Sequence, residues 1–198
     1  MQHYYTQDPT VPHDRKTVML EIDGKEYAFT TDAGVFSRER IDFGSDLLLR
    51  ACPDPRGKLL DIGCGCGVLG LCMKLRYPDS CEPCMSDVNR RALDLARENA
   101  ARLGISADIR ESDGLSAWEG ERFSAILTNP PIRTGKATYY PWFAQSYEKL
   151  LPGGWFACVV RKSQGGPSVK KELMNIFGNV EVLDKSDGYW ILYSVKQA

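Results

Sequence analysis

The sequence predicts an α/β fold of one domain, in which a mainly parallel sheet carries helices on both faces. From residue 58 onward, short apolar segments alternate with longer segments whose apolar residues recur at helical spacing. A glycine cluster joins the first of these strands to the helix that follows it. Repeated strand–helix units of this kind form parallel strands covered by helices. The chain has 198 residues, 43% of them hydrophobic, which is enough for a core without disulfides or a structural metal.

The N-terminal part has a different pattern, and we expect residues 1–30 to form an arm and a β-hairpin ahead of a core of residues 31–198. Residues 1–16 are polar and proline-containing. Apolar residues alternate over residues 17–30 around Asp23-Gly24, a dipeptide that favours a type I′ turn. Helical spacing then predicts a helix over residues 43–51, and we expect Pro53 and Pro55 to end it.

The core elements follow from apolar runs, helical stripes and stop signals. The runs predict strands at 58–62, 81–86, 105–110, 123–128, 155–160, 180–183 and 189–195. The stripes predict helices at 68–77, 88–103, 143–151 and 169–177. Gly104 and Gly178 occupy helix-stop positions, and the short separation of the last two strands predicts a closing hairpin.

Composition excludes several classes of protein. The longest apolar run, residues 155–160, is far too short to span a membrane, and the polar N-terminus has no signal-peptide core. We therefore expect a cytoplasmic protein with no membrane partner. The net charge of −1 means that any nucleic-acid surface must be a local basic patch.

The histidine and cysteine counts narrow the chemistry further. Only two histidines occur, both near the N-terminus, which argues against a Ser-His-Asp hydrolase or a histidine metal centre. The seven cysteines are an odd number, as expected for reduced thiols. Cys81 and Cys84 have zinc-ligand spacing, but the only candidate second pair, Cys64 and Cys66, lies in the glycine cluster. We therefore expect no metal site and interpret these cysteines as small buried hydrophobic residues.

The strongest signal for a ligand is the segment from Asp61 to Gly67, which reads Asp-Ile-Gly-Cys-Gly-Cys-Gly. Glycines between a strand and a helix permit positive φ angles and a close approach of backbone N–H groups to a ligand. Asp87 follows the second strand of the core, where a carboxylate can accept hydrogens from both ribose hydroxyls. Asp113, followed by Gly114, comes after the third strand and could accept a hydrogen from an adenine amino group.

The same glycines allow a second interpretation. Gly65-x-Gly67-x-x-Gly70 satisfies the dinucleotide fingerprint of NAD-binding oxidoreductases, with Asp87 as its ribose acid. In that fingerprint the first glycine follows the strand closely, whereas Asp61 and Gly63 intervene here. The length of the chain also leaves little room for a second, substrate-binding domain.

The second strong signal is Asn129-Pro130-Pro131-Ile132, directly after the fourth strand of the core. Two prolines give this turn a fixed shape and donate no backbone hydrogen bond. Their carbonyls and the Asn129 side chain place acceptors close together. Such a pair can accept both hydrogens of a planar NH₂ group and direct the nitrogen lone pair at an electrophile.

These residues resemble the ordered motifs of class I S-adenosylmethionine-dependent methyltransferases, in which Asn-Pro-Pro marks enzymes that methylate amino groups of nucleobases or glutamine. Further segments resemble the catalytic half of the small-subunit rRNA guanine-N2 methyltransferases (RsmC type). These segments are residues 3–5, 31–37, 42–45, 129–136, 177–180 and 188–189. The resemblance implies a Rossmann-like sheet of seven strands whose last strand is antiparallel, with an N-terminal hairpin.

The resemblance also implies roles for individual residues, with S-adenosyl-L-methionine as the cofactor. The glycines Gly63, Gly65 and Gly67 would pass under its methionine part, with Asp61 facing the amino end. Cofactor contacts are further implied for Phe36, Asp42, Asp87, Val88, Asp113, Gly114 and Asn129. The catalytic set would be Asn129, Pro130 and Pro131, and the substrate set Ile132, Arg133 and Lys136.

The implied partner is RNA, most specifically guanine N2 in 16S rRNA. Phosphate contacts could come from Arg38, Arg40, Arg133, Lys136, Arg161 and Lys162. The same chemistry would serve protein glutamine, DNA adenine or a small molecule, and an NAD-binding oxidoreductase is the alternative from another class.

Two departures from the family pattern affect substrate binding. The longer rRNA enzymes carry a second, degenerate copy of the domain, so substrate recognition by this chain could differ or need a homodimer. Many Asn-Pro-Pro enzymes continue with an aromatic residue that stacks on a flipped base, whereas Ile132 follows here. Phe36, Tyr139 and Tyr140 are candidates to replace that aromatic ring.

Overall fold

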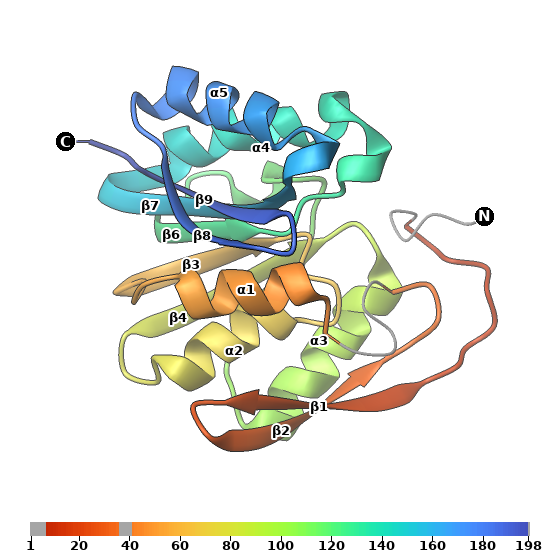
Figure 1. The fold of residues 1–198 in the computed structure, drawn as a ribbon. Helices are drawn as coiled ribbons and strands as arrows, with labels where there is room; N and C mark the ends of the chain where they lie inside the picture. The colour runs from red at the N-terminus through yellow and green to blue at the C-terminus, as the bar shows by residue number, and fades with distance from the viewer. Residues whose placement is uncertain (1–6, 36–40, 198) are drawn as a thin grey trace.

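The computed structural model describes residues 7–35 and 41–197, which form one seven-stranded sheet, flanking helices and a separate hairpin (Figure 1). In spatial order the sheet contains β5 (Asp108–Glu111), β4 (Cys81–Asp87), β3 (Gly57–Ile62), β6 (Phe123–Thr128), β7 (Leu150–Arg161), β9 (Tyr189–Val195) and β8 (Glu181–Ser186). The pairs from β5 to β7 are parallel, and β9 is antiparallel to both β7 and β8. The prediction of seven strands with an antiparallel last strand is confirmed.

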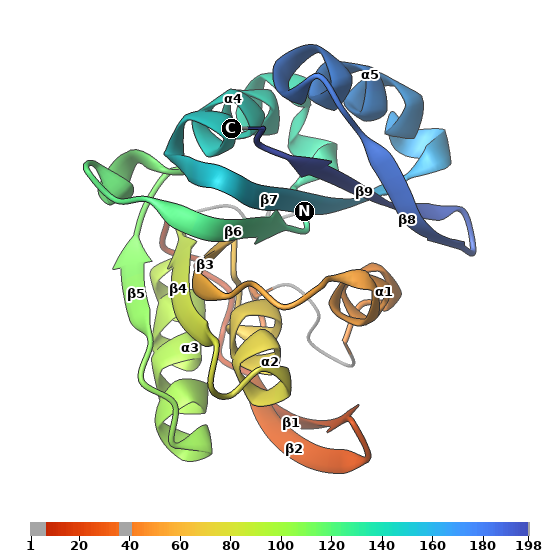
Figure 2. The same cartoon turned by 90° about the vertical axis from the view of Figure 1, so that its left-hand side faces the viewer.

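Helices cover both faces of this sheet, as predicted (Figure 2). One face carries α1 (Phe43–Ala51), α2 (Val68–Arg76) and α3 (Arg90–Leu103), and the other carries α4 (Lys136–Lys149) and α5 (Gly166–Phe177). Two apolar clusters fill the space between the layers, because the strands are buried on both sides. Within the described part of the chain, no helix is long and apolar enough to cross a membrane.

The hairpin of β1 (Lys16–Ile22) and β2 (Lys25–Thr31) packs beside α2 and α3 rather than extending the sheet. Asp23 and Gly24 have φ angles of 49° and 79°, as the predicted turn requires. The buried side chain of Asn99 accepts from the Thr30 N–H at 2.8 Å and donates to the Cys66 carbonyl at 2.9 Å. The hairpin is thereby tied through α3 to the loop that follows β3.

Several element boundaries differ from the prediction, among them the start of α4 at Lys136 instead of residue 143, and three of the differences have a clear cause. Leu150 and Leu151 begin β7 instead of ending α4, because Leu150 pairs with Phe123 across a bulge. Val88 precedes α3, since the Asn89 side chain caps that helix by accepting from Ala92 N–H. The strand predicted at 105–110 begins only at Asp108, the first residue that pairs with β4.

Candidate functional site

A pocket of about 1350 Å³ runs along the carboxyl ends of the parallel strands. Its walls come from the residues that follow β3, β4, β5 and β6, from the end of β7, the start of β9, and α1 and α4. Ligands bind at this edge in open α/β sheets, where loops after neighbouring strands converge. Of the residues expected from the sequence, the lining contains Asp42, Gly63, Gly65, Asp87, Val88, Asp113, Gly114, Asn129, Pro130, Pro131, Ile132, Arg133 and Arg161.

The remaining expected residues lie elsewhere. Asp61, Gly67, Lys136 and Lys162 are outside the pocket lining. Lys136 lies over the Tyr140 ring and donates to Ser168 Oγ at 2.6 Å. Phe36, Arg38 and Arg40 lie outside the described residues, as does the segment 3–5.

The three glycines after β3 all adopt the left-handed region, with φ angles of 72° at Gly63, 56° at Gly65 and 89° at Gly67. Side chains other than glycine rarely adopt this conformation. Gly63 and Gly65 face the pocket, whereas a Cβ atom on Gly67 would lie 3.2 Å from the Cβ of Ala96 in α3. The first two glycines therefore leave space for a ligand, and the third allows α3 to pack closely.

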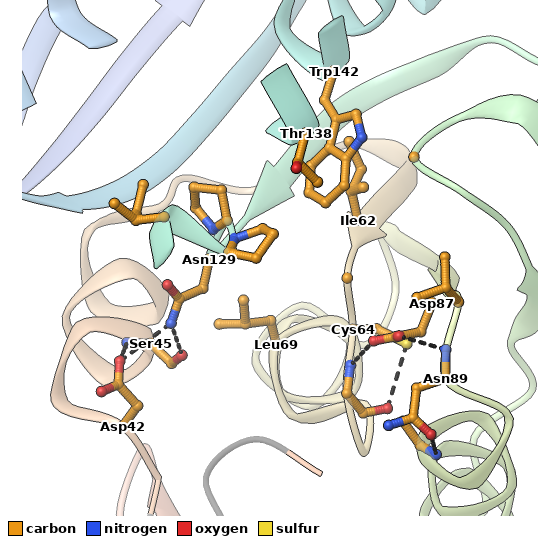
Figure 3. A pocket seen from close by; sticks show the side chains of 18 of the residues that line it. Asp42, Ser45, Ile62, Cys64, Leu69, Asp87, Asn89, Asn129, Thr138 and Trp142 are labelled. Atoms are coloured by element: carbon orange, nitrogen blue, oxygen red, sulfur yellow. Dashed lines mark hydrogen bonds between the residues drawn. The ribbon is translucent and has the colours of Figure 1, made fainter. Parts of the chain in front are cut away.

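Asp87 at the end of β4 braces this loop from within the pocket (Figure 3). Its Oδ2 accepts from Gly65 N–H and its Oδ1 from Asn89 N–H, each at 2.9 Å. A carboxylate oxygen has two lone pairs, so both oxygens can also accept from ribose hydroxyls. Burial raises the pKa of Asp87, while the backbone hydrogen bonds act in the opposite direction.

Asp61 is fully buried beneath the loop rather than exposed in the pocket. Its Oδ2 accepts from Gly70 N–H at 3.0 Å, and its Oδ1 has no hydrogen-bond partner among the residues that the structure describes. Burial raises the pKa of this carboxyl group to about 7. Gly70 itself is a packing glycine, because a Cβ atom there would lie 2.7 Å from Met85 Sδ.

The far end of the pocket combines an acidic residue with an aromatic wall. Asp113 is exposed after β5, and Gly114 follows it with a φ angle of 55°. A Cβ atom on Gly114 would lie only 2.5 Å from Trp142 Nε1. Trp142 comes from α4 and also lies 4.0 Å from the position of a Cβ atom on Gly63. The sequence analysis missed Trp142, because only the folded chain brings α4 over the two glycines.

At the opposite end, the Asn129 side chain reaches toward the first turn of α1 (Figure 3). Its Nδ2 donates to Ser45 Oγ at 2.9 Å and to Asp42 Oδ2 at 3.2 Å. Its Oδ1 accepts no hydrogen bond from the described residues. The Pro130 carbonyl accepts from Ile132 N–H at 2.8 Å and keeps a second lone pair. The two acceptors expected from Asn-Pro-Pro are therefore both present at this end of the pocket.

The aromatic candidates from the sequence do not line this end of the pocket. Tyr139 is 1% exposed in the core, and Tyr140 pairs its hydroxyl group with Ser168 Oγ at 2.7 Å. Tyr189, the first residue of β9, lines the pocket instead. The guanidinium carbon of Arg161 lies 4.4 Å from the centre of the Tyr189 ring, and Nη2 donates to the Tyr189 hydroxyl at 2.7 Å.

All seven cysteines are buried free thiols, and Cys64 and Cys66 belong to the pocket lining. Burial raises the pKa of Cys81 to about 12 and of Cys84 to about 11, so both stay protonated and weakly nucleophilic near neutral pH. Within residues 7–35 and 41–197 there is no cluster of three or more histidine, cysteine or acidic side chains that could hold a metal ion.

The residues present fit S-adenosylmethionine. The glycine loop leaves the space that a Cβ would fill, Asp87 offers a half-buried acceptor pair, and Trp142 supplies an apolar wall near Asp113. The acceptors of Asn129 and Pro130 lie at the other end, where a substrate amine would meet the cofactor's methyl group.

Comparisons with known proteins agree with this fit. The model of the methyltransferase small domain family matches residues 26–193. The chain is 39% identical to the uncharacterized protein YbxB of Bacillus subtilis, over 98% of both chains. It is 38% identical to ribosomal RNA small subunit methyltransferase C of Pseudomonas putida, over 80% of this chain and 48% of that one.

A solved structure extends the comparison to a bound ligand. The 16S rRNA N2 methyltransferase RsmC of T. thermophilus, in complex with AdoMet and guanosine, superposes with a TM-score of 0.82 and 27% identity. The match covers 96% of this chain and 52% of that one, so this chain spans about half the length of the rRNA enzymes it matches. The chain therefore belongs to the methyltransferase small domain family and is an S-adenosylmethionine-dependent methyltransferase.

Proposed function

We propose that this enzyme methylates an exocyclic amino nitrogen of an RNA base, namely guanine N2 in 16S rRNA. The observation that carries the proposal is the pair of residues Asn129 and Pro130 in the lining of this pocket, with an Asn129 Oδ1 that accepts no hydrogen bond from the described residues. The activities of the rRNA methyltransferases that this chain resembles support the choice of RNA. Because the chain spans about half of those enzymes, the substrate is a proposal for this chain.

In the proposed reaction, Asn129 and Pro130 hold the amine by accepting its two hydrogens. The nitrogen lone pair is then directed out of the plane of the base. S-Adenosylmethionine would supply a methyl group on a positively charged sulfur. The nitrogen would attack the methyl carbon in line with the S–C bond, which breaks and leaves the neutral thioether S-adenosylhomocysteine. The two acceptors stabilise the positive charge that develops on the amine, and holding the reactants in place supplies much of the acceleration.

No strong base is needed for this transfer. The neutral amino group of an aromatic base would attack without first losing a proton, and the methylated nitrogen would then release one proton to water. A base within an RNA helix must first be flipped out or presented in a single strand. Ile132, Arg133 and Lys136 follow the Asn-Pro-Pro turn and are proposed to contact the substrate. Tyr189 lines the pocket and carries the Arg161 guanidinium over its ring. We propose that this pair supplies the stacking contact that the aliphatic Ile132 cannot make.

The test uses tritiated S-adenosylmethionine with unmodified small ribosomal subunits, naked rRNA and a total protein extract. We expect label that nuclease releases and protease does not, and nucleoside analysis should identify N2-methylguanosine. Label that only protease releases would replace the proposal with a protein glutamine substrate. Label in another nucleoside would support RNA as the substrate but would show that guanine N2 is not the methylated atom.

A further inference from the structure

The side-chain amide of Asn129 is held in one orientation by the first turn of α1 (Figure 3). Asp42 is the N-cap residue of α1, and its Oδ2 accepts from Ser45 N–H at 3.2 Å. The same oxygen accepts from Asn129 Nδ2 at 3.2 Å, and Ser45 Oγ accepts from that nitrogen at 2.9 Å. Both cap residues line the pocket, so helix capping and the site share one set of atoms.

The orientation of the amide follows from the chemistry of its partners. An ionised carboxylate only accepts hydrogen bonds, whereas one end of an asparagine amide only donates and the other only accepts. The Asn129 atom that faces Asp42 must therefore be the nitrogen. A flipped amide would place two acceptor oxygens against each other and leave the NH₂ group in the pocket, where it cannot accept hydrogens from a substrate amine.

The turn that carries Asp42 and Ser45 is fixed by packing. A Cβ atom on Gly44 would lie 2.9 Å from the Tyr189 ring, and Phe43 packs against the same ring with centroids 5.7 Å apart. Leu48, one turn later, is fully buried. The start of α1 is therefore held against β9, and the two anchoring oxygens stay beside the end of β6.

We propose that Asp42 and Ser45 are positioning residues that select Asn129 Oδ1 as the acceptor for the substrate amine. This inference rests on the proposed role of Asn129 in amine methylation. The new element is the direction of the hydrogen bonds. Asp42 and Ser45 accept and the Asn129 nitrogen donates, so the Asn129 oxygen is the atom left to face the substrate.

The test removes the anchoring acceptors. Asn129→Asp places a carboxylate against Asp42, and we expect kcat to fall by roughly 10²-fold or more, as for loss of one preorganised polar group. The double variant Asp42→Gly with Ser45→Ala removes both acceptors and leaves the Asn129 amide free to turn, so we expect kcat to fall by about 10-fold or more; glycine is a tolerated N-cap residue. In the double variant Asp42→Asn with Ser45→Ala, one amide oxygen takes the place of Oδ2 and can accept from both the N–H of residue 45 and Asn129 Nδ2. We expect this conservative variant to recover several-fold of the kcat lost in Asp42→Gly with Ser45→Ala.

Folding and cofactor affinity are the matched controls. Asparagine is as good an N-cap as aspartate, so Asp42→Asn should keep α1 and the melting temperature. Asp42 and Asn129 are also expected to contact the cofactor, so the affinity for S-adenosylhomocysteine is measured for each variant and kcat is compared at saturating S-adenosylmethionine. Parent kcat in Asp42→Gly with Ser45→Ala, or no recovery of kcat in Asp42→Asn with Ser45→Ala, in folded protein, would overturn the inference.

A second measurement needs no activity. The side-chain NH₂ resonances of Asn129, assigned by their loss in Asn129→Asp, should shift in Asp42→Asn and in Ser45→Ala. Unchanged resonances in both variants would overturn the inference. If the parent enzyme labels no amine at all, the proposed function fails, while these resonances still decide whether α1 orients the amide.

Discussion

Gly114 illustrates how a single residue shapes the pocket, because no side chain fits between it and the Trp142 indole. A Cβ atom there would lie 2.5 Å from Trp142 Nε1. We expect Gly114→Ala to displace the indole and to weaken S-adenosylhomocysteine binding by roughly 10-fold or more, as overpacking costs about 1–3 kcal/mol. Isothermal titration calorimetry measures this change.

Gly120→Ala is the matched control for the backbone. Gly120 has a φ angle of 76°, comparable to that of Gly114, but no atom lies within 4 Å of a Cβ built on it. Its substitution carries the strain of the left-handed region without the clash. Equal losses of cofactor affinity in the two variants would show that strain, and not the Trp142 contact, explains the effect.

Asp61 gives the apoprotein a pH-dependent stability. Burial raises the pKa of its carboxyl group from an ordinary 3.8 to about 7 in the folded state. The folded protein therefore holds this proton more tightly than the unfolded chain does. The protonated Asp61 therefore stabilises the folded state fully below about pH 4. As the pH rises toward 7 this stabilisation is lost, and the free energy of unfolding falls by about 4 kcal/mol. Urea unfolding between pH 4 and 7 measures this loss.

Asp61→Asn is the comparison for that titration. An asparagine keeps an oxygen to accept from Gly70 N–H and has no proton to lose over this range. The variant should therefore lack the decline between pH 4 and 7. An identical decline in both proteins would assign it to other groups.

At the scale of elements, the antiparallel direction of β9 brings Tyr189 to the substrate end. The parallel strands reach this edge with their last residues, whereas β9 reaches it with its first, and Arg161 of β7 pairs with Tyr189. We expect Tyr189→Ala to raise KM for RNA by roughly 10-fold, since base–aromatic stacking contributes about 1–3 kcal/mol. Tyr189→Phe keeps the ring and should change KM less.

Tyr140→Ala distinguishes this ring from one of the aromatic candidates that follow the Asn-Pro-Pro turn in sequence. Tyr140 belongs to α4 and lies outside the pocket lining. Steady-state kinetics should show a normal KM for RNA in this variant. A raised KM in Tyr140→Ala together with a normal KM in Tyr189→Ala would contradict the assignment.

The elements that the sequence predicted well carry their signals locally. The Asp23-Gly24 turn and the Gly104 cap act through their own backbone, and both are where the sequence placed them. Leu150 was placed in a helix because its spacing suits one, but pairing with Phe123 from a distant strand decided its conformation.

The same distinction holds for the site. Most of the expected pocket residues follow strands directly, and parallel strands bring such residues to one edge. Ser45, Trp142 and Tyr189 come from two helices and the antiparallel strand. Their places depend on how separate elements pack, which one sequence does not specify. Asp61 has the spacing of a ligand contact, yet it is buried beneath the loop.

Across the whole molecule, the near-neutral net charge conceals an uneven distribution of ion pairs. Many arginines distant from the acceptor end are paired, among them Arg50 with Asp46, Arg90 with Glu111 and Arg110 with Asp108. Arg133 and Lys162 follow β6 and β7 near the acceptor end, and among the described residues neither makes an ion pair. Unpaired cations beside a pocket are available for phosphates.

We therefore expect the affinity for RNA to fall with salt although the protein is weakly acidic. Each cation that neutralises a phosphate contributes about one to the slope of log affinity against log salt concentration. Arg133→Gln and Lys162→Gln should each weaken binding and reduce that slope by about one. Arg50→Gln, at the opposite end of α1 from the pocket, should leave the slope unchanged. Fluorescence anisotropy with an rRNA fragment measures the slopes, and a slope near zero for the parent protein would contradict an electrostatic RNA surface at this end.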